Sequence, residues 1–328
     1  MTNKVLLSTI VALTVSATSA FAADLGGRLV TKAPPPPPPS PWDIAFGAGI
    51  ASDYEFRGIT QSDHKPSVNA YFEPRYNISK ELQLYAGIAG ESIDFPNRAA
   101  AEIDLYGGVR PTFGPLALDL GFIYYWYPGG QCFNAAVPGD CAANASLAGG
   151  LPNGNVIKKD LSWYEPYIKA VWTINDSWAV GGNFYYTPSY LNSGADGEYL
   201  SGTLKYTFAT GFLPSGIGGY LSGEVGRQWL GTTDSFYGVA AFPTGVPLPD
   251  YTTWNVGLGF TWKVFTLDLR YYDTDLSKGN CNVISGDQTA AFDPANVSAI
   301  NPGGLGSNWC SATFVAKFTA DLTLDSLK

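Results

Sequence analysis

The chain has 328 residues, with 28 Asp and Glu against 19 Lys and Arg, and a formal net charge of −9. An acidic chain repels phosphate backbones, so we expect no nucleic-acid partner. The sequence holds 38 Gly and 20 Tyr. Abundant Gly and aromatic residues without helical periodicity favour a sheet closed into a barrel over a packed helical core.

The first residues indicate an exported protein. A short basic start, the apolar run Val5–Val15 and the small-residue pattern Ala20–Ala22 predict a signal peptide over residues 1–22. Residues 23–41 contain the uninterrupted run Pro34–Pro39, which cannot form a β-ladder and favours a polyproline II rod. We expect a Pro-rich periplasmic tether here. A periplasmic partner that binds this segment is the open alternative.

From Trp42 onward, apolar and polar residues alternate with the period of a β-strand. Turn residues divide the alternation into segments of about ten residues, the length that a tilted strand needs to cross a bilayer. We predict about twelve strands: Trp42–Arg57, Ser67–Ile78, Leu82–Ser92, Ala101–Pro111, Leu116–Tyr127, Trp163–Ile174, Trp178–Pro188, Tyr199–Phe208, Ile217–Arg227, Tyr251–Trp262, Phe265–Thr274 and Trp309–Leu322.

The connections between these segments are alternately short and long. Short turns on one side and long loops on the other are typical of a barrel with periplasmic turns and extracellular loops. The tryptophans separate in the same way: Trp42, Trp172, Trp178 and Trp262 lie near short turns, and Trp126, Trp163, Trp229, Trp254 and Trp309 near long loops. Indole rings favour membrane interfaces. We therefore predict that residues 42–328 form an all-β transmembrane antiparallel barrel in the outer membrane of a Gram-negative cell, in contact with lipid and lipopolysaccharide.

The four cysteines lie in the long loops or at their ends. An exported chain meets an oxidising periplasm, so we expect the disulfides Cys132–Cys141 and Cys281–Cys310 among three possible pairings. Neither pair has His or carboxylate groups at ligand spacing. We predict no metal site and no cofactor.

His64 is the single histidine, within the loop sequence Ser62-Asp63-His64. A hydrolase needs a placed base with a nucleophile, and neighbours in sequence do not supply that geometry. We favour a solvated loop residue and expect no catalytic residues, with an outer-membrane hydrolase using His64 as the less favoured alternative.

The alternation turns a set of charged side chains toward the lumen. Charges of both signs can hold water and set ion preference, and the acidic excess favours a weak preference for cations. The alternative is that these charges pair across a narrow barrel and fill it. The predicted pore-lining residues are Asp53, Glu55, Arg57, Glu73, Arg75, Glu102, Asp104, Arg110, Glu165, Lys169, Asp268 and Arg270.

Several short motifs resemble the TorF-type porin family, also filed as the Gcw conserved hypothetical proteins. They are Ser52-Asp53-Tyr54, Phe56-Arg57-Gly58, Thr60-Gln61-Ser62, Ser92 with Asp94-Phe95, Glu102 to Gly107, Tyr124-Tyr125, Tyr127-Pro128-Gly129, Tyr164-Glu165 and Tyr186-Thr187-Pro188 with Tyr190. The resemblance implies an outer-membrane barrel with a porin role and brings no catalytic residues.

We therefore expect a porin-like channel for passive diffusion of ions and small hydrophilic solutes. A plugged structural or adhesive barrel, acting through its extracellular loops or its Pro-rich tether, is the main alternative. The oligomeric state and the transported solute stay open.

Overall fold

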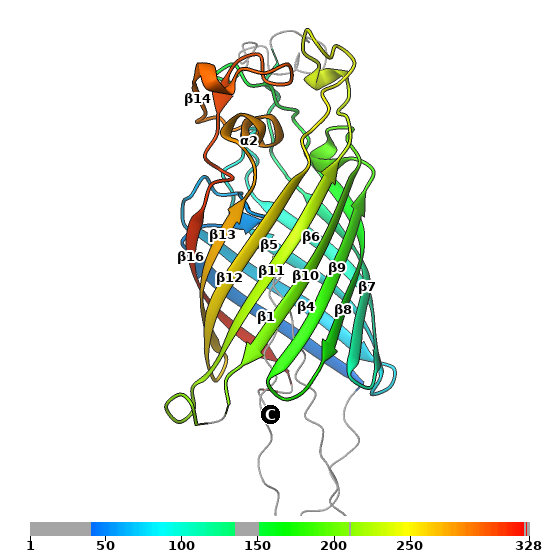
Figure 1. Ribbon diagram of the computed structural model, residues 1–328. Coiled ribbons are helices and arrows are strands. Elements are labelled where there is room, and N and C mark those ends of the chain that lie inside the picture. Colours follow the sequence, from blue (N-terminus) through cyan, green and yellow to red (C-terminus); the bar gives the residue numbers. More distant parts are fainter. Residues whose placement is uncertain (1–40, 135–150, 210, 325, 327–328) are drawn as a thin grey trace, which may run out of the picture.

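The computed structural model describes residues 41–134, 151–209, 211–324 and 326. The predicted signal peptide and residues 23–40 of the predicted tether lie outside this range. In the described part of the chain, twelve long antiparallel strands close into one barrel (Figure 1), which confirms the predicted fold class. The strands are β1 (Trp42–Ala51), β4 (Ser67–Asn77), β5 (Leu82–Glu91), β6 (Glu102–Phe113), β7 (Leu116–Trp126), β8 (Trp163–Thr173), β9 (Trp178–Thr187), β10 (Gly197–Thr207), β11 (Gly218–Leu230), β12 (Tyr251–Trp262), β13 (Phe265–Thr274) and β16 (Thr313–Thr323).

The ring of strands is continuous because β1 pairs with β4 on one side and with β16 on the other. Closure leaves no unpaired sheet edge, which is what a β-structure needs inside a bilayer. The short connections gather at one end, and the long loops gather at the other (Figure 1). The described residues of the short connections are 78–81, 114–115, 174–177, 208–209, 211–217 and 263–264. We take the long-loop end as extracellular, as in outer-membrane barrels.

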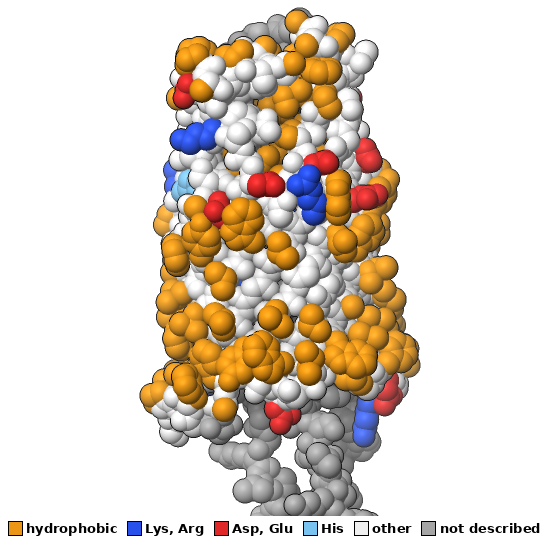
Figure 2. Space-filling view, viewed as in Figure 1, with side chains coloured by type: hydrophobic (Ala, Val, Ile, Leu, Met, Phe, Trp, Pro, Cys, Tyr) orange, Lys and Arg blue, Asp and Glu red, His pale blue; other side chains and the backbone are white. Residues whose placement is uncertain are grey.

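Each strand has one lipid-facing side and one lumen-facing side. On β8, Tyr164, Ile168 and Trp172 are exposed, whereas Glu165 and Tyr167 are buried inside the barrel. Figure 2 shows hydrophobic side chains over the outer wall, with the charged side chains of this face gathered toward its two ends. The alternating pattern therefore matches a membrane-spanning wall.

Most tryptophans form the two interface belts, but two do not. Trp42, Trp172, Trp178 and Trp262 are exposed near the short turns, and Trp126, Trp229 and Trp254 are exposed near the long loops. Trp163 and Trp309 are buried, so their predicted place in the outer belt is wrong. Both instead pack among the loop residues at the extracellular end of the lumen.

The prediction that the first strand runs to Arg57 is also wrong. β1 ends at Ala51, and a separate short hairpin of β2 (Glu55–Phe56) and β3 (Ile59–Thr60) follows. Arg57 and Gly58 form its two-residue turn with φ values of +50° and +78°, as tight hairpins of this kind require. Asp53, Glu55 and Arg57 therefore belong to a loop and not to the wall.

The last predicted strand begins later than expected, at Thr313 instead of Trp309, because residues 309–312 still belong to the preceding loop. β11 extends to Leu230, three residues beyond its predicted end at Arg227. The other strand bounds differ from the prediction by at most two residues.

The long loops carry short elements of their own. These are η2 (Tyr190–Asn192), η3 (Ser235–Tyr237), α2 (Lys278–Ser285), β14 (Ala291–Phe292), η4 (Pro294–Asn296) and β15 (Leu305–Gly306). Among the described residues, no helix is both long and apolar enough to cross a membrane. The predicted disulfide Cys281–Cys310 is present. Cys132 is also disulfide-bonded, and its predicted partner Cys141 lies outside the described residues.

Candidate functional site

The hairpin of β2 and β3 lies inside the extracellular end of the barrel. It follows β1, and β9 stands opposite β1 in the ring of strands. The Arg57 guanidinium carbon nevertheless lies 4.9 Å from the ring centroid of Tyr185 on β9 and 4.4 Å from that of Tyr199 on β10. The hairpin therefore crosses the lumen and reaches the opposite wall.

Polar contacts hold the tip of the hairpin on that wall. Arg57 Nη2 forms an ion pair with Glu165 Oε2 at 2.7 Å, and Arg57 Nη1 donates to Gln228 Oε1 at 2.8 Å. The Arg57 and Glu165 side chains are almost wholly buried, so solvent hardly screens their attraction. Arg57 is thus the anchor of the hairpin.

Aromatic side chains close the space around the hairpin. Phe56 packs edge-on against Tyr125 and Trp163, with ring centroids 5.8 Å and 6.2 Å away. Tyr125 and Trp163 stack at 4.5 Å, and Tyr190 meets Trp163 at 4.9 Å. Alternation in the sequence does not predict these contacts, although Trp163 alternates in phase with the inward-facing Glu165. In this conformation the hairpin and its aromatic neighbours occupy the extracellular end of the lumen.

A carboxylate cluster of Glu91, Glu102 and Asp104 lies beside the hairpin. Glu91 and Glu102 are direct cross-strand partners on β5 and β6, and one oxygen from each of the three carboxylates lies within 4.8 Å of the others. The Tyr54 hydroxyl donates to Glu102 Oε1 at 2.5 Å, and the Tyr127 hydroxyl donates to Glu102 Oε2 at 2.8 Å. Tyr54 directly precedes β2, so the hairpin region covers this cluster.

Ion pairs line the lumen between the hairpin and the short-turn end. Glu73 pairs with Arg75 at 2.6 Å and with Arg110 at 2.8 Å, and Arg110 also pairs with Asp119 at 3.1 Å. On the other side of the barrel, Asp268 and Arg270 pair at 2.9 Å. Lys169 Nζ lies over the ring of Tyr167, 4.6 Å from its centroid. Fixed charges of both signs therefore line this part of the lumen.

The structure places the predicted pore-lining residues in two groups. Nine lie on barrel strands with inward-facing side chains: Glu73, Arg75, Glu102, Asp104, Arg110, Glu165, Lys169, Asp268 and Arg270. The other three, Asp53, Glu55 and Arg57, lie on the loop that enters the lumen. Only Arg57 and Glu165 join the two groups by an ion pair among the described residues.

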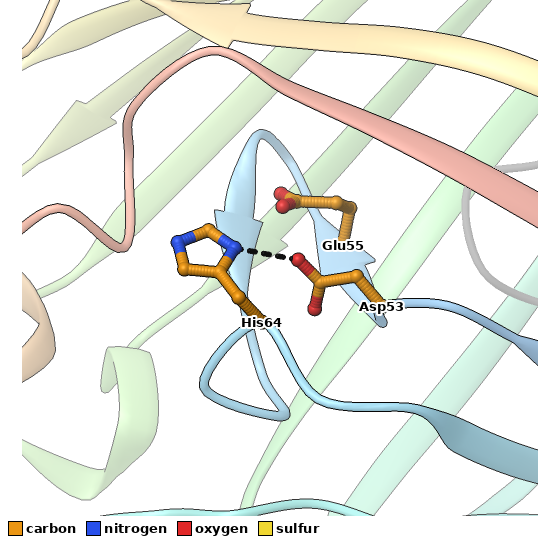
Figure 3. Close-up of side chains that lie close together, drawn as sticks. All are labelled: Asp53, Glu55 and His64. Atoms are coloured by element: carbon orange, nitrogen blue, oxygen red, sulfur yellow. Dashed lines mark hydrogen bonds and ion pairs between the residues drawn. The ribbon is translucent and has the colours of Figure 1, made fainter.

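Asp53, Glu55 and His64 lie close together at the base of the hairpin (Figure 3). One carboxylate oxygen of Asp53, one of Glu55 and one ring nitrogen of His64 lie within 4.8 Å of one another. His64 Nδ1 is 2.7 Å from Asp53 Oδ2, and the side chain of His64 is 29% exposed. His64 is therefore not the freely solvated loop residue that the sequence analysis favoured.

This group has unusual electrostatics. Burial and the neighbouring Asp53 carboxylate raise the pKa of Glu55 well above its usual range. Burial alone would raise the pKa of Asp53, but hydrogen bonds from His64, Thr60 and Ser62 lower it overall. The hydrogen bond to Asp53 raises the pKa of His64 against the opposing effect of burial. The lowered pKa of Asp53 and the raised pKa of His64 favour a charged pair between these two side chains, whereas the raised pKa of Glu55 favours its neutral form.

The geometry around His64 does not form a Ser-His-Asp triad. Ser62 Oγ donates to Asp53 Oδ1 at 2.9 Å, while His64 Nε2 lies 3.2 Å from the Asn308 carbonyl oxygen. A triad needs the second ring nitrogen of His to face the Ser hydroxyl. The arrangement gives no support to the hydrolase alternative.

A cavity of about 330 Å³ lies among the extracellular loops, above the hairpin. Ile59 and Gln61 of the hairpin region contribute to its lining, and most of the rest is apolar. The larger side chains around it are Phe95, Leu161, Tyr190, Tyr237, Ile284 and Trp309. No local sequence pattern predicts this cavity, because its lining comes from loops that are distant in sequence.

The chain matches one protein-family model over residues 36–293. The family is described as "Bacterial protein of unknown function (Gcw_chp)". No curated protein matches the chain at a significant level.

Several solved outer-membrane barrels are similar to the chain. A Pseudomonas aeruginosa FadL homologue matches with 12% identity and a TM-score of 0.43, covering 87% of this chain and 90% of the other. The NanC porin matches with 9% identity and a TM-score of 0.40, covering 84% and 97%. LpxR from Salmonella typhimurium matches with 11% identity and a TM-score of 0.38, covering 84% and 99%.

Proposed function

Because this chain belongs to the Gcw_chp family of bacterial proteins of unknown function, we propose its function from its own geometry: it is a gated, porin-like outer-membrane channel. Ions and small hydrophilic solutes would pass by diffusion, and the hairpin of β2 and β3 closes the lumen in the conformation described above. The TorF-type porin role implied by the sequence motifs is part of this proposal. Contact with lipopolysaccharide is a further part of it, and residues 23–41 serve as a periplasmic tether. A periplasmic partner that binds this segment stays the alternative.

The observation that carries the proposal is the way the lumen is blocked. The obstruction is a loop hairpin whose tip is held by Arg57 through one ion pair and one hydrogen bond. It is not a part of the hydrogen-bonded barrel wall. The hairpin is held by side-chain contacts, both polar and aromatic, and not by the strand ladder of the wall. A loop held in this way can withdraw while the wall stays intact, and gates are commonly built from such segments.

Withdrawal of the hairpin would change the charge that a passing ion meets. Glu91, Glu102, Asp104 and Glu165 would then face the path without their covering residues. Carboxylates that line a pore favour cations. We therefore keep the weak cation preference as part of the proposal and assign it to this extracellular half of the lumen.

Conductance of the purified, refolded chain in a planar lipid bilayer tests the proposal. We expect a mostly closed barrel with rare discrete openings, and a reversal potential in a salt gradient that leans toward cations. Absence of any opening in the wild type and in a variant whose hairpin is shown to be released would contradict a channel function.

Neutralising the cluster should move the ion preference. In a Glu102→Gln and Asp104→Asn double variant, we expect the cation-to-anion permeability ratio of the openings to fall toward one, because two carboxylates leave the path. The reversal potential in a salt gradient measures this ratio. The matched control is Glu81→Gln with Asp176→Asn, which removes the same charge from exposed short turns. Equal ratios in the two double variants would remove the cluster from the conduction path.

The extracellular cavity supports the second candidate function, a barrel that binds a ligand through its loops. Its mostly apolar lining and its place above the hairpin suit a small apolar or amphipathic compound. A folded barrel that stays silent even with its hairpin released would favour this second function over the first.

A further inference from the structure

Glu55 is a buried carboxylate without a visible partner. The residue is 5% exposed, and neither carboxylate oxygen accepts a hydrogen bond from the described residues. It also points toward Asp53, a second carboxylate (Figure 3). An ionised carboxylate in such a position is costly unless a cation compensates it. A cation bound here would take the place of the proton that keeps the Glu55 carboxyl group neutral.

The neighbours of Asp53 leave one of its oxygens directed into the group. Asp53 Oδ1 accepts hydrogen bonds from Thr60 Oγ1 at 2.5 Å and from Ser62 Oγ at 2.9 Å. Asp53 Oδ2 faces His64. Such hydrogen bonds to a ligating carboxylate fix its orientation in metal sites.

The neighbours of His64 act in the same way. Its Nε2 lies 3.2 Å from the Asn308 carbonyl oxygen, to which an Nε2–H donates. This contact fixes the ring so that Nδ1 points at Asp53 Oδ2, 2.7 Å away. A backbone carbonyl that holds the second nitrogen is the usual support of a metal-ligating histidine. Without a metal ion, a proton on Nδ1 makes the contact to Asp53.

We propose that Asp53, Glu55 and His64 bind one divalent transition-metal ion of the zinc type. The ligands are Asp53 Oδ2, the Glu55 carboxylate and His64 Nδ1, and water completes the coordination. The metal ion takes the place of the Nδ1 proton of His64 and of the carboxyl proton of Glu55, and both protons are released to solvent. A set of one imidazole and two carboxylates suits zinc better than calcium or magnesium, which prefer oxygen alone.

The distances require only small adjustments. Ligands of a tetrahedral zinc ion lie about 2.0–2.2 Å from the metal and hence roughly 3.4 Å from one another, and the three donor atoms here lie within 4.8 Å of one another. Rotation of the Glu55 side chain can bring its carboxylate closer. The partly exposed His64 ring, at the extracellular end, offers a route for entry.

The site also joins the two ends of the hairpin. Asp53 and Glu55 precede the turn at Arg57 and Gly58, and His64 follows it. A bound ion would stabilise the hairpin in its place inside the lumen. This consequence rests on the proposed channel function, whereas the binding of the ion does not.

Titration calorimetry on the full refolded chain without a histidine tag tests the binding. We expect one zinc ion per chain, with proton release. Glu55→Gln and His64→Ala each remove a direct ligand, so each should lower the affinity for zinc by at least the roughly 100-fold that loss of a supporting group can cost. Asp94→Asn is the matched control, because this carboxylate lies at the same extracellular end outside the group and should leave the affinity unchanged. No binding, or equal binding by all variants, would overturn the site.

His64 provides a readout that does not depend on any variant. It is the one histidine of the chain, so the chain labelled with ¹⁵N-histidine gives the signals of a single imidazole ring. Zinc should move the Nδ1 resonance and leave Nε2 protonated, whereas magnesium should move neither. A ring that does not respond to zinc contradicts the proposal even if zinc binds elsewhere.

Conductance measurements separate the binding of zinc from its proposed effect on the opening of the channel. Zinc on the extracellular side should lower the frequency of openings in the wild type and not in His64→Ala. Zinc binding without this effect would retain the metal site and refute its role in gating. Failure of the channel function itself would leave the calorimetric and spectroscopic results unchanged.

Discussion

Replacing Arg57 by alanine is expected to release the hairpin from the opposite wall. The substitution removes the ion pair with Glu165 and the hydrogen bond with Gln228, and it leaves the buried Glu165 without its cation. Breaking a buried ion pair in this way costs about 3–5 kcal/mol. The docked hairpin loses this stabilisation, whereas in the undocked state water can reach Glu165. We therefore expect the closed-to-open equilibrium to shift by roughly two to four orders of magnitude toward the open state.

Two measurements report the release of the hairpin. The open probability in a planar bilayer should rise strongly, and chymotrypsin should cleave after Tyr54 or Phe56, which are buried in the docked hairpin. Arg57→Lys should fall between the wild type and alanine, since a lysine keeps the charge but not the two-sided geometry of guanidinium.

Arg227→Ala is the matched control for this prediction. Arg227 is also an arginine near the extracellular end, but it is partly exposed and its ion pairs to Asp250 and Asp275 are long, at 3.9 Å and 3.6 Å. Exposed pairs of this kind contribute little. If Arg57→Ala folds and behaves like Arg227→Ala in both assays, Arg57 is not the anchor of the hairpin.

The barrel could be predicted from sequence because its signals are local. Period-two alternation, short turns and interface aromatics each depend on residues that are neighbours in sequence. The hairpin could not be found in this way, because the alternation of β1 continues through Tyr54 and Phe56 after the strand has ended. The one local signal was Gly58, whose φ of +78° completes the turn that begins at Arg57.

The site was only partly predictable for a related reason. Alternation correctly turned Glu102, Asp104 and Glu165 inward, but it could not tell that Arg57 pairs with Glu165 across the lumen. That contact depends on a loop that reaches the far wall and on the aromatic residues around it. The group of Asp53, Glu55 and His64 likewise forms only when residues on both sides of the hairpin turn come together.

An arginine in place of Ile168 is expected to destabilise the barrel in its membrane. Ile168 is 50% exposed and lies on β8 midway between Tyr164, near the long loops, and Trp172, near the short turns. These two rings mark the interfaces, so Ile168 lies near the middle of the hydrocarbon layer. An arginine on the lipid face at this depth costs about 2–4 kcal/mol of unfolding free energy.

Urea unfolding from lipid vesicles, followed by tryptophan fluorescence, measures this cost. The matched control is Phe292→Arg, which places the same charge on an exposed hydrophobic position of β14 in an extracellular loop. A surface substitution there should change the unfolding free energy by no more than about 0.5 kcal/mol. Only a lipid environment around β8 separates the two variants, because both positions are exposed and apolar in the wild type. Equal effects would mean that the apolar band in Figure 2 does not face hydrocarbon, and the assignment of the barrel to a membrane would fail with it.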